Sequence, residues 1–227
     1  MSKDFYAFIF ARGGSKGITK KNLRKINGIS LVRRSIDLAL QLDNVLKIFL
    51  STDSQEIANE VNSLDVEVIK RPYELAKDET SEILAWKHAI NVVEEKFGSF
   101  DKFVSIPPTS PLRSLEDVKN IMFLLNAKFD LTLGITKSKR NPWFNMVKKS
   151  EGNQVTKIFN DKSFSRRQDA PLTFDLTTVA YAAHTSYVIN SKNLLDGVIG
   201  GLEIPEERSL DIDTEIDLKM AEFFLNQ

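Results

Sequence analysis

The sequence contains no cysteine and only two histidines, His88 and His184. The lack of cysteine excludes disulfides, zinc–thiolate sites, iron–sulfur clusters and thiol nucleophiles. Two histidines are also too few for a histidine-rich metal site. Any metal must therefore be held by oxygen ligands, which favours Mg²⁺, with Mn²⁺ as the alternative.

The sequence also lacks long apolar runs. None approaches the roughly 20 residues needed to span a bilayer. The N-terminal apolar stretch is broken by Arg12, too early for a signal peptide. With 42% apolar and 27% charged residues, the composition is that of a globular protein, and the formal net charge of zero does not indicate a large nucleic-acid footprint. We therefore expect a cytoplasmic protein that binds neither nucleic acid nor membrane.

A buried strand is predicted over Phe5–Ala11, where seven consecutive residues are apolar or aromatic. It leads into a loop with three glycines between positions 13 and 17, and glycine lets backbone N–H groups approach an anion closely. Residues 5–36 contain eight Lys and Arg residues and no carboxylate. The glycine spacing matches neither the P-loop nor the dinucleotide-binding fingerprint. We therefore interpret Arg12–Asn22 as a triphosphate-binding loop of another type; the alternative is a glycine-rich turn with a solvated basic face.

Strands and helices alternate after this loop. Further strands are predicted at Val45–Thr52, Val66–Lys70, Lys102–Ile106 and Asp130–Thr136. The clearest helix is predicted over Ser81–Phe97, where apolar residues are spaced three and four apart. This alternation is typical of an α/β fold with a doubly wound, Rossmann-like, mostly parallel sheet. Ligands of such sheets bind at the carboxyl ends of the strands.

Residues 138–178 interrupt the alternation, because they are polar, with short apolar alternations and no long helical pattern. We interpret them as a β-rich arm of a single domain that spans residues 1–227. Such an arm covers the site or grips a second subunit; an ordinary surface excursion is the alternative. A returning strand is then predicted over Val179–Ile189, a short helix over Ser191–Leu195 and a final helix over Glu215–Leu225.

The end of the chain is acidic, since residues 196–222 contain nine Asp and Glu residues. Asp211 and Asp213 lie on the same side of an extended segment, because strand side chains alternate, and two such carboxylates can share one hard cation. Acids at the start of a helix are the alternative, which fits Glu215 and Asp217 better. We expect the basic loop and this acidic segment to meet around a nucleoside triphosphate, although two oppositely charged solvated faces would need no ligand.

Six sequence blocks together resemble a known family, the cytidylyltransferases that activate sialic acid and related acidic sugars. This family includes CMP-N-acylneuraminate synthetases and their CMP-legionaminate, CMP-pseudaminate and CMP-Kdo relatives. The resemblance covers nearly the whole chain. The blocks that carry it are residues 11–17 with 21–23, 51–53, 71–78, 108–113, 167–171 and 211–217.

The resemblance implies transfer of CMP from CTP to the anomeric hydroxyl of a nonulosonic sugar acid, with release of pyrophosphate, by a homodimer. It implies nucleotide binding by Ala11, Arg12, Gly13, Gly14, Ser15, Lys16, Asn22, Arg71 and Ser81. It implies catalytic roles for Arg12, Lys21, Asp211 and Asp213, of which the two aspartates would hold Mg²⁺. It implies sugar contacts from Thr109, Ser110, Arg167, Gln168 and Tyr181. The general base stays open between a metal-bound water or hydroxide and Asp211.

The chain departs from the family pattern at three places. Pro107 stands where sialic-acid enzymes usually have Gln, Thr177-Thr178 stands where Asn-Gly is usual, and Glu82 replaces a small polar residue near the base. Because two of these places are on the sugar side, the identity of the sugar stays open. Two other functions also stay open: a glycosyltransferase that uses Asp211 and Asp213 as a D-x-D metal motif, and a non-catalytic nucleotide-binding protein of the same fold.

Overall fold

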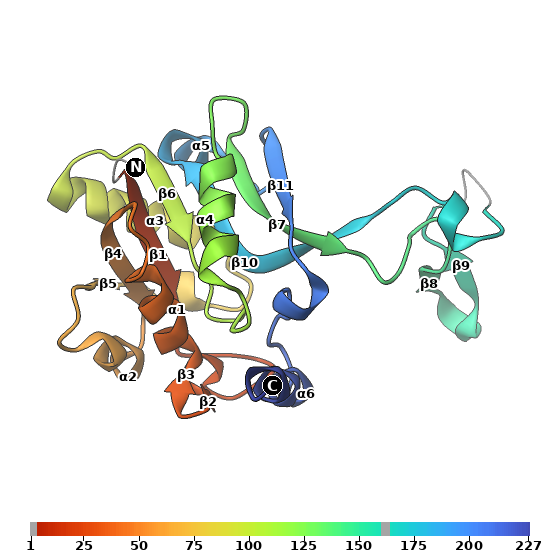
Figure 1. The fold of residues 1–227 in the computed structure, drawn as a ribbon, viewed down its shortest axis with the longest axis horizontal. Helices are drawn as coiled ribbons and strands as arrows, with labels where there is room; N and C mark the ends of the chain where they lie inside the picture. Colours follow the sequence, from red (N-terminus) through yellow and green to blue (C-terminus); the bar gives the residue numbers. More distant parts are fainter. Residues whose placement is uncertain (1–3, 160–163) are drawn as a thin grey trace.

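One seven-stranded sheet organises the protein in a computed structural model that describes residues 4–159 and 164–227 (Figure 1). The strand order is β11-β7-β10-β6-β1-β4-β5. The bounds of these strands are β1 (Phe5–Phe10), β4 (Val45–Thr52), β5 (Glu67–Lys70), β6 (Lys102–Ser105), β7 (Leu131–Lys137), β10 (Phe174–His184) and β11 (Ile199–Glu203). β10 is antiparallel to both of its neighbours, and all the other pairings are parallel. The predicted mostly parallel sheet is therefore confirmed.

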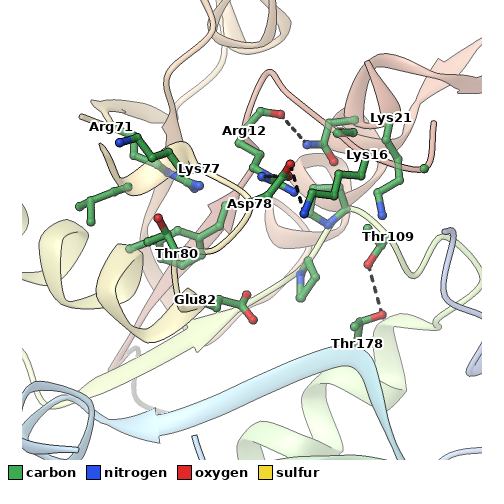
Figure 2. A pocket seen from close by; sticks show the side chains of 18 of the residues that line it. Arg12, Lys16, Lys21, Arg71, Lys77, Asp78, Thr80, Glu82, Thr109 and Thr178 are labelled. Atoms are coloured by element: carbon green, nitrogen blue, oxygen red, sulfur yellow. Dashed lines mark hydrogen bonds and ion pairs between the residues drawn. The ribbon is translucent and has the colours of Figure 1, made fainter. Parts of the chain in front are cut away.

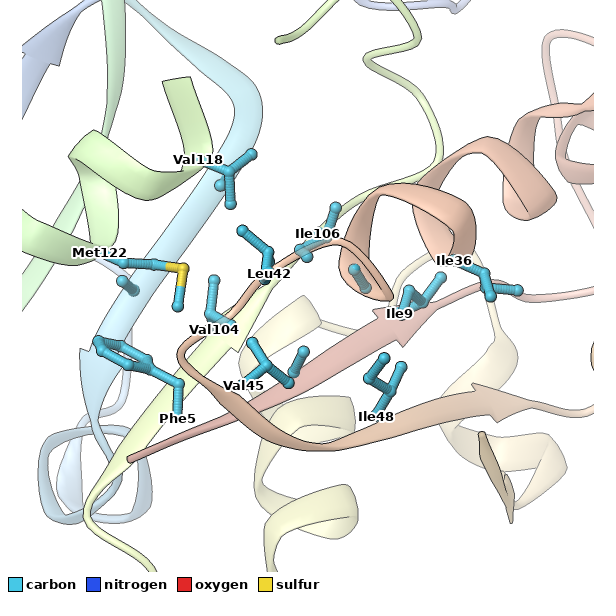
Figure 3. Packing of buried hydrophobic residues seen from close by; sticks show 14 of the residues in the cluster. Phe5, Ile9, Ile36, Leu42, Val45, Ile48, Val104, Ile106, Val118 and Met122 are labelled. Atoms are coloured by element: carbon cyan, nitrogen blue, oxygen red, sulfur yellow. The ribbon is translucent and has the colours of Figure 1, made fainter. Parts of the chain in front are cut away.

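Helices cover both faces of this sheet, because side chains of successive strand residues point to opposite faces. On one face, Ile9 of β1 packs with residues of α1 and α4 (Figure 3). On the other face, Phe8 of β1 packs with Trp86 of α3 and with residues of α5. The helices are α1 (Leu31–Ala39), α2 (Gln55–Ala58), α3 (Glu82–Phe97), α4 (Leu115–Leu124), α5 (Thr185–Asn190) and α6 (Glu215–Leu225).

Short elements join these parts. Two small antiparallel pairs are present, β2 (Lys25–Ile26) with β3 (Ile29–Ser30) and β8 (Val147–Lys149) with β9 (Val155–Lys157). Single turns of 3₁₀-helix occur at η1 (Lys21–Leu23), η2 (Asn59–Val61), η3 (Tyr73–Ala76), η4 (Glu151–Asn153), η5 (Arg167–Asp169) and η6 (Glu206–Arg208). Within the described ranges, none of the helices is both long and apolar enough to cross a membrane.

The hairpin of β8 and β9 projects away from the sheet at the far end of β7 and β10 (Figure 1). Its apolar residues are exposed, as is Leu172 near the start of β10, whose side chain is 69% accessible. The predicted arm over residues 138–178 includes positions 160–163, which lie outside the described residues. Its use in dimerisation stays a prediction.

The predicted bounds after the arm are wrong: the returning strand begins at Phe174, not at Val179. β10 ends at His184 rather than Ile189, and the next helix is α5, not the predicted Ser191–Leu195. The strand gives way to α5 at Thr185, whose N–H donates to the Asp101 carbonyl at 2.8 Å. Residues 192–197 form turns instead of the predicted helix, and the Asp196 carboxylate accepts hydrogen bonds from the backbone N–H groups of residues 192 and 193 there.

The start of α4 is tied to the acidic end of the chain. Ser114 and Asp117 form a reciprocal capping box, and Asp117 also accepts two hydrogen bonds from the Arg208 guanidinium, at 2.8 and 3.0 Å. Burial alone would raise the pKa of Asp117. The bonds from Arg208 and Ser114 outweigh burial, however, so its pKa lies below the ordinary value of 3.8. This contact fixes the segment that leads to Asp211 against the start of α4.

We expect Asp117→Asn to destabilise the fold by about 1.5–3 kcal/mol at pH 7, because hydrogen bonds to a buried charged group are lost. A lowered pKa means that the carboxylate stabilises the fold above its unfolded pKa, and that this stability is lost as pH falls through the folded value. The difference in the free energy of unfolding between variant and wild type should therefore shrink below about pH 4. Urea unfolding at several pH values measures it. Asp43→Asn is the matched control, since Asp43 is 91% exposed beside Lys119; an equal effect of both variants would contradict the prediction.

Candidate active site

One pocket opens at the carboxyl ends of β1, β5 and β6 (Figure 2). Its lining includes Phe10 at the end of β1, Arg71 after β5 and Pro107 after β6. Residues from the acidic end of the chain and from β10 complete the wall, with Asp213 and Thr178. Segments that are far apart in the sequence therefore meet where a mostly parallel sheet places its ligands.

The glycine-rich loop after β1 is held by hydrogen bonds to its neighbours. The N–H of Ala11 donates to the Ser51 carbonyl at 3.0 Å, and the N–H of Gly13 donates to the Asp53 carboxylate at 2.8 Å. The buried amide of Asn22 donates to the Arg12 carbonyl at 2.9 Å and closes the loop on itself. These bonds fix the shape of the loop before any ligand binds.

Three cations of this loop, Arg12, Lys16 and Lys21, line the pocket together with Ser15. The Asp78 carboxylate forms an ion pair with Arg12 and lies 3.6 Å from the Lys16 ammonium. The Lys21 ammonium lies 3.0 Å from the Asp213 carboxylate. A triphosphate could take over these cations, because partly exposed ion pairs are individually weak.

The contact between the basic loop and the acidic segment, expected from the sequence, is close. A Cβ atom at Gly17 would lie 2.2 Å from the Asp213 carbonyl oxygen, so the two backbones touch. The neighbouring Ile212 is fully buried with Ile18, and its N–H donates to the Thr109 carbonyl at 2.8 Å. Asp213 therefore has a fixed place beside the loop.

The second aspartate faces a different group. The Thr178 hydroxyl donates to the Asp211 carboxylate at 2.9 Å, and the Thr109 hydroxyl lies 3.3 Å from that of Thr178. Thr109 and Thr178 line the pocket, whereas Asp211 lies behind them. The described chain segments contain no group of three or more His, Cys, Asp or Glu residues that could hold a metal. Two carboxylates still suit Mg²⁺, which takes its remaining ligands from phosphates and water.

The opposite end of the pocket has a different character. Arg71 is buried there, and it donates to Ser51 through Nε to Oγ at 3.2 Å and through Nη2 to the carbonyl at 2.9 Å. Burial lowers its pKa to about 10, which leaves it charged at neutral pH. Ser81 and Glu82, at the start of α3, line this end. Glu82 is exposed at the pocket, but the protein atoms around its carboxyl group reduce its hydration and so raise its pKa; the Trp86 indole N–H and the Arg71 charge offset only part of this effect.

Several predicted site residues lie elsewhere. Gly14 is exposed outside the pocket lining, and Ser110 is buried with its hydroxyl 3.5 Å from the Leu210 carbonyl. Tyr181 is buried against Trp86 with 5.5 Å between ring centroids, and burial raises its pKa. Arg167 and Gln168 line a separate hollow on the arm, where Arg167 donates to the Ser138 carbonyl at 2.7 Å. None of these side chains lines the pocket of its own chain.

Residues that the sequence did not assign to the site also line the pocket. These are Phe10, Leu75, Lys77, Asp78, Thr80, Ala85 and Pro108; Glu82, Pro107 and Thr178, which the sequence singled out as departures from the family pattern, line it as well. Most of them lie just after predicted strand ends or at the start of the predicted α3 helix. This position in the chain is the signal that could have identified them. Asp78 lies in the block 71–78 that carries the family resemblance, but the sequence assigned it no role, because an acid is not expected among cations that are predicted to bind phosphate.

Comparison with known proteins identifies relatives over nearly the whole chain. A family model described as cytidylyltransferase matches residues 6–186. The chain is 32% identical over 225 residues to post-translational flagellin modification protein B of Campylobacter coli, covering 96% of this chain and 94% of that protein. It is 33% identical over 221 residues to CMP-N,N'-diacetyllegionaminic acid synthase of Campylobacter jejuni, covering 96% and 93%.

A solved structure supports the fold. The structure of CMP:2-keto-3-deoxy-manno-octonic acid synthetase complexed with CTP matches with a TM-score of 0.69 over 99% of both chains. The sequence identity is only 15%, so this similarity concerns the architecture.

We expect Gly17→Ala to separate the loop from the acidic segment, because the added methyl group meets the Asp213 carbonyl. Overpacking of this kind typically costs about 1–3 kcal/mol. Gly14→Ala is the matched control, since nothing lies within 4 Å of a Cβ atom there. The melting temperature should fall, and the affinity for a triphosphate should decrease, in the Gly17 variant alone. Equal behaviour of the two variants would show that the close approach at Gly17 does not constrain the site.

Proposed function

Because this chain belongs to the cytidylyltransferase family, we propose that it transfers CMP from CTP to the anomeric hydroxyl of a nonulosonic, sialic-acid-like sugar acid and releases pyrophosphate. The relative in Campylobacter jejuni is named as a synthase of the CMP form of such an acid. The observation that carries the proposal is the pocket in which the loop cations meet Asp213. It provides a site for a triphosphate beside carboxylates that suit a divalent ion.

Electrostatics explains what the loop would contribute. A triphosphate and a sugar carboxylate repel each other, and the attack on the α-phosphate brings them together. Arg12, Lys16 and Lys21 would neutralise the triphosphate, which would replace Asp78 as the partner of the first two. Loss of one such preorganised contact typically costs about 2.7–4 kcal/mol of transition-state stabilisation.

We further infer that Asp211 and Asp213 hold Mg²⁺, with Mn²⁺ as the alternative. Both side chains offer oxygen ligands, and Asp213 lies beside the cations that would bind the triphosphate. Thr178 would orient Asp211 through its hydrogen bond. A bound Mg²⁺ would neutralise charge on the phosphates; the other ligands would be phosphate oxygens and water.

A homodimer would explain why two of the predicted sugar contacts lie on the arm and not in the pocket. Arg167 and Gln168 do not line the pocket of their own chain, but they lie on an arm with exposed apolar residues such as Leu172 and Leu176. We infer that the arm of a second copy brings them to the sugar end of the pocket. The enzyme would act in the cytoplasm, where its nucleotide substrate is made.

A direct assay tests the proposed reaction. The purified protein is incubated with Mg²⁺, CTP and each member of a panel of nonulosonic acids, while pyrophosphate release is followed and products are identified by mass spectrometry. Release that depends on one sugar acid, with formation of its CMP derivative, is expected. Tight CTP binding without release for any sugar would favour a non-catalytic protein, and turnover of a nucleotide-sugar would favour the D-x-D glycosyltransferase.

We expect Asp213→Ala to lower kcat by at least about 100-fold, because it removes a carboxylate from the proposed metal site. The fold should persist, since this side chain is 71% exposed. Calorimetric titration with Mg²⁺ in the presence of CTP should show weaker metal binding. The control is Glu222→Ala at an exposed position of α6; wild-type activity in the Asp213 variant would refute the metal assignment.

We expect Arg167→Ala to raise the KM for the sugar about tenfold or more while the KM for CTP stays unchanged, because a hydrogen-bonded charge contact typically contributes about 1.5–3 kcal/mol. Lys148→Ala, on exposed β8, is the control.

Mixed dimers then test which chain supplies the arm. In a hybrid dimer, the Arg167→Ala subunit keeps an intact pocket and the Asp213→Ala subunit keeps an intact arm. These two intact parts form one complete site only if the arm of each subunit reaches the pocket of its partner. Partial recovery of activity on mixing and subunit exchange is expected. No recovery, despite demonstrated exchange, would place the arm at its own chain's pocket or away from the site.

A further inference from the structure

Glu82 is out of place in a pocket that would bind polyanions. It is the first residue of α3, and its carboxylate points into the pocket (Figure 2). Within residues 4–159 and 164–227, no ion pair involves this carboxylate. In the same part of the chain, the buried indole N–H of Trp86, one turn further along α3, forms no hydrogen bond of ordinary geometry, but its attraction lowers the pKa of the Glu82 carboxyl. An anionic group here opposes triphosphate binding unless it recognises a hydrogen-bond donor.

The lining of the pocket indicates what lies beside Glu82. The cations of the glycine-rich loop mark the triphosphate end, so a nucleobase would lie at the other end. Phe10, Leu75 and Ala85 provide apolar surface there. The Arg71 guanidinium lies 5.6 Å from the centroid of the Phe10 ring. A flat ring at this end would have apolar contacts on its faces and two polar groups, the Arg71 donor and the Glu82 acceptor, near its edge.

We propose that the Glu82 carboxylate accepts a hydrogen bond from the exocyclic amine of cytosine and thereby selects CTP over UTP. This inference rests on the proposed function and extends it to the choice of nucleotide. Carboxylates accept hydrogen bonds from the cytosine 4-amino group, and uracil presents a carbonyl oxygen at the same position. With UTP, two acceptors would face each other without a proton between them. Arg71 would donate to the acceptor edge that both rings share.

The electrostatic state of Glu82 is consistent with this role. Burial raises the pKa of its carboxyl, the indole N–H of Trp86 and the charge of Arg71 lower it, and the charge of Asp211 raises it. A hydrogen bond from an amine would offset part of the cost of holding this charge among protein atoms. A uracil carbonyl would increase that cost.

Direct binding in the absence of sugar tests the proposal. CTP and UTP are titrated by calorimetry into wild type, Glu82→Gln, Glu82→Ser and the control Glu79→Gln. Glu79 lies in the loop just before α3, is exposed, and is outside the pocket lining. Wild type and the control should prefer CTP by about tenfold or more. In Glu82→Gln the preference should fall at least several-fold, mainly through tighter UTP binding, because the amide can donate to the uracil carbonyl. Glu82→Ser should lose preference mainly through weaker CTP binding.

The other outcomes would overturn the assignment. An unchanged preference in Glu82→Gln, or equal weakening of both nucleotides, would show that Glu82 does not read the base. A lower kcat with unchanged nucleotide binding would place Glu82 at the reacting sugar instead. Thermal melting of each variant guards against loss of fold. If wild type binds neither nucleotide, the proposed function fails as well, whereas a CTP preference that survives substitution removes only the role of Glu82.

Discussion

The backbone contact between Gly17 and Asp213 is the constraint on which the site depends. Only a residue without a side chain can lie so close to the Asp213 carbonyl. This approach places the Lys21 ammonium 3.0 Å from a carboxylate that follows it by 192 residues. Ile212, fully buried between the two chain segments, keeps them together through apolar packing. The pocket therefore combines the cations of one end of the chain with the acids of the other through a contact that needs no ligand to form.

Charge balance explains why such a concentration of cations is compatible with a stable fold. Without partners, Arg12 and Lys16 would repel each other, because both line the same pocket. Asp78 pairs with both, and Asp213 pairs with Lys21. These carboxylates occupy positions beside the cations that phosphate groups would also need. Binding of a triphosphate would therefore replace carboxylate partners of the cations by phosphate partners. The net gain from a triphosphate is therefore smaller than the number of cations suggests, which makes neutral contacts to the base and the sugar important for affinity.

The sequence predicted the sheet well, and it also placed the glycine-rich loop at the pocket, because both depend on local patterns. Apolar strands and glycine-rich loops are visible in a few consecutive residues, and strand ends meet at one edge of such a sheet. The boundary between β10 and α5 was missed, because Tyr187 and Val188 pack in the core either as strand or as helix residues. Ser110 and Tyr181 were expected at the sugar, but tertiary packing turns both side chains into the core. The partnership of Asp78 with two cations has no local pattern and needed coordinates.

The two ends of the pocket are built on separate supports, so their selectivities can change independently. Pro107 and Val179 both accept hydrogen bonds from Nη1 of the Arg113 guanidinium, at 2.6 and 3.2 Å. Arg113 is fully buried, which lowers its pKa to about 9, and it reaches α1 through Ser35. Pro107 and Thr178, two of the places that depart from the family pattern, thus lie on one wall that a single buried cation holds together. The end at which we propose that the base binds rests instead on the Ser51 contacts of Arg71 and on the start of α3. A change of sugar can therefore be accommodated on the Arg113 wall without moving the groups that would read the nucleotide.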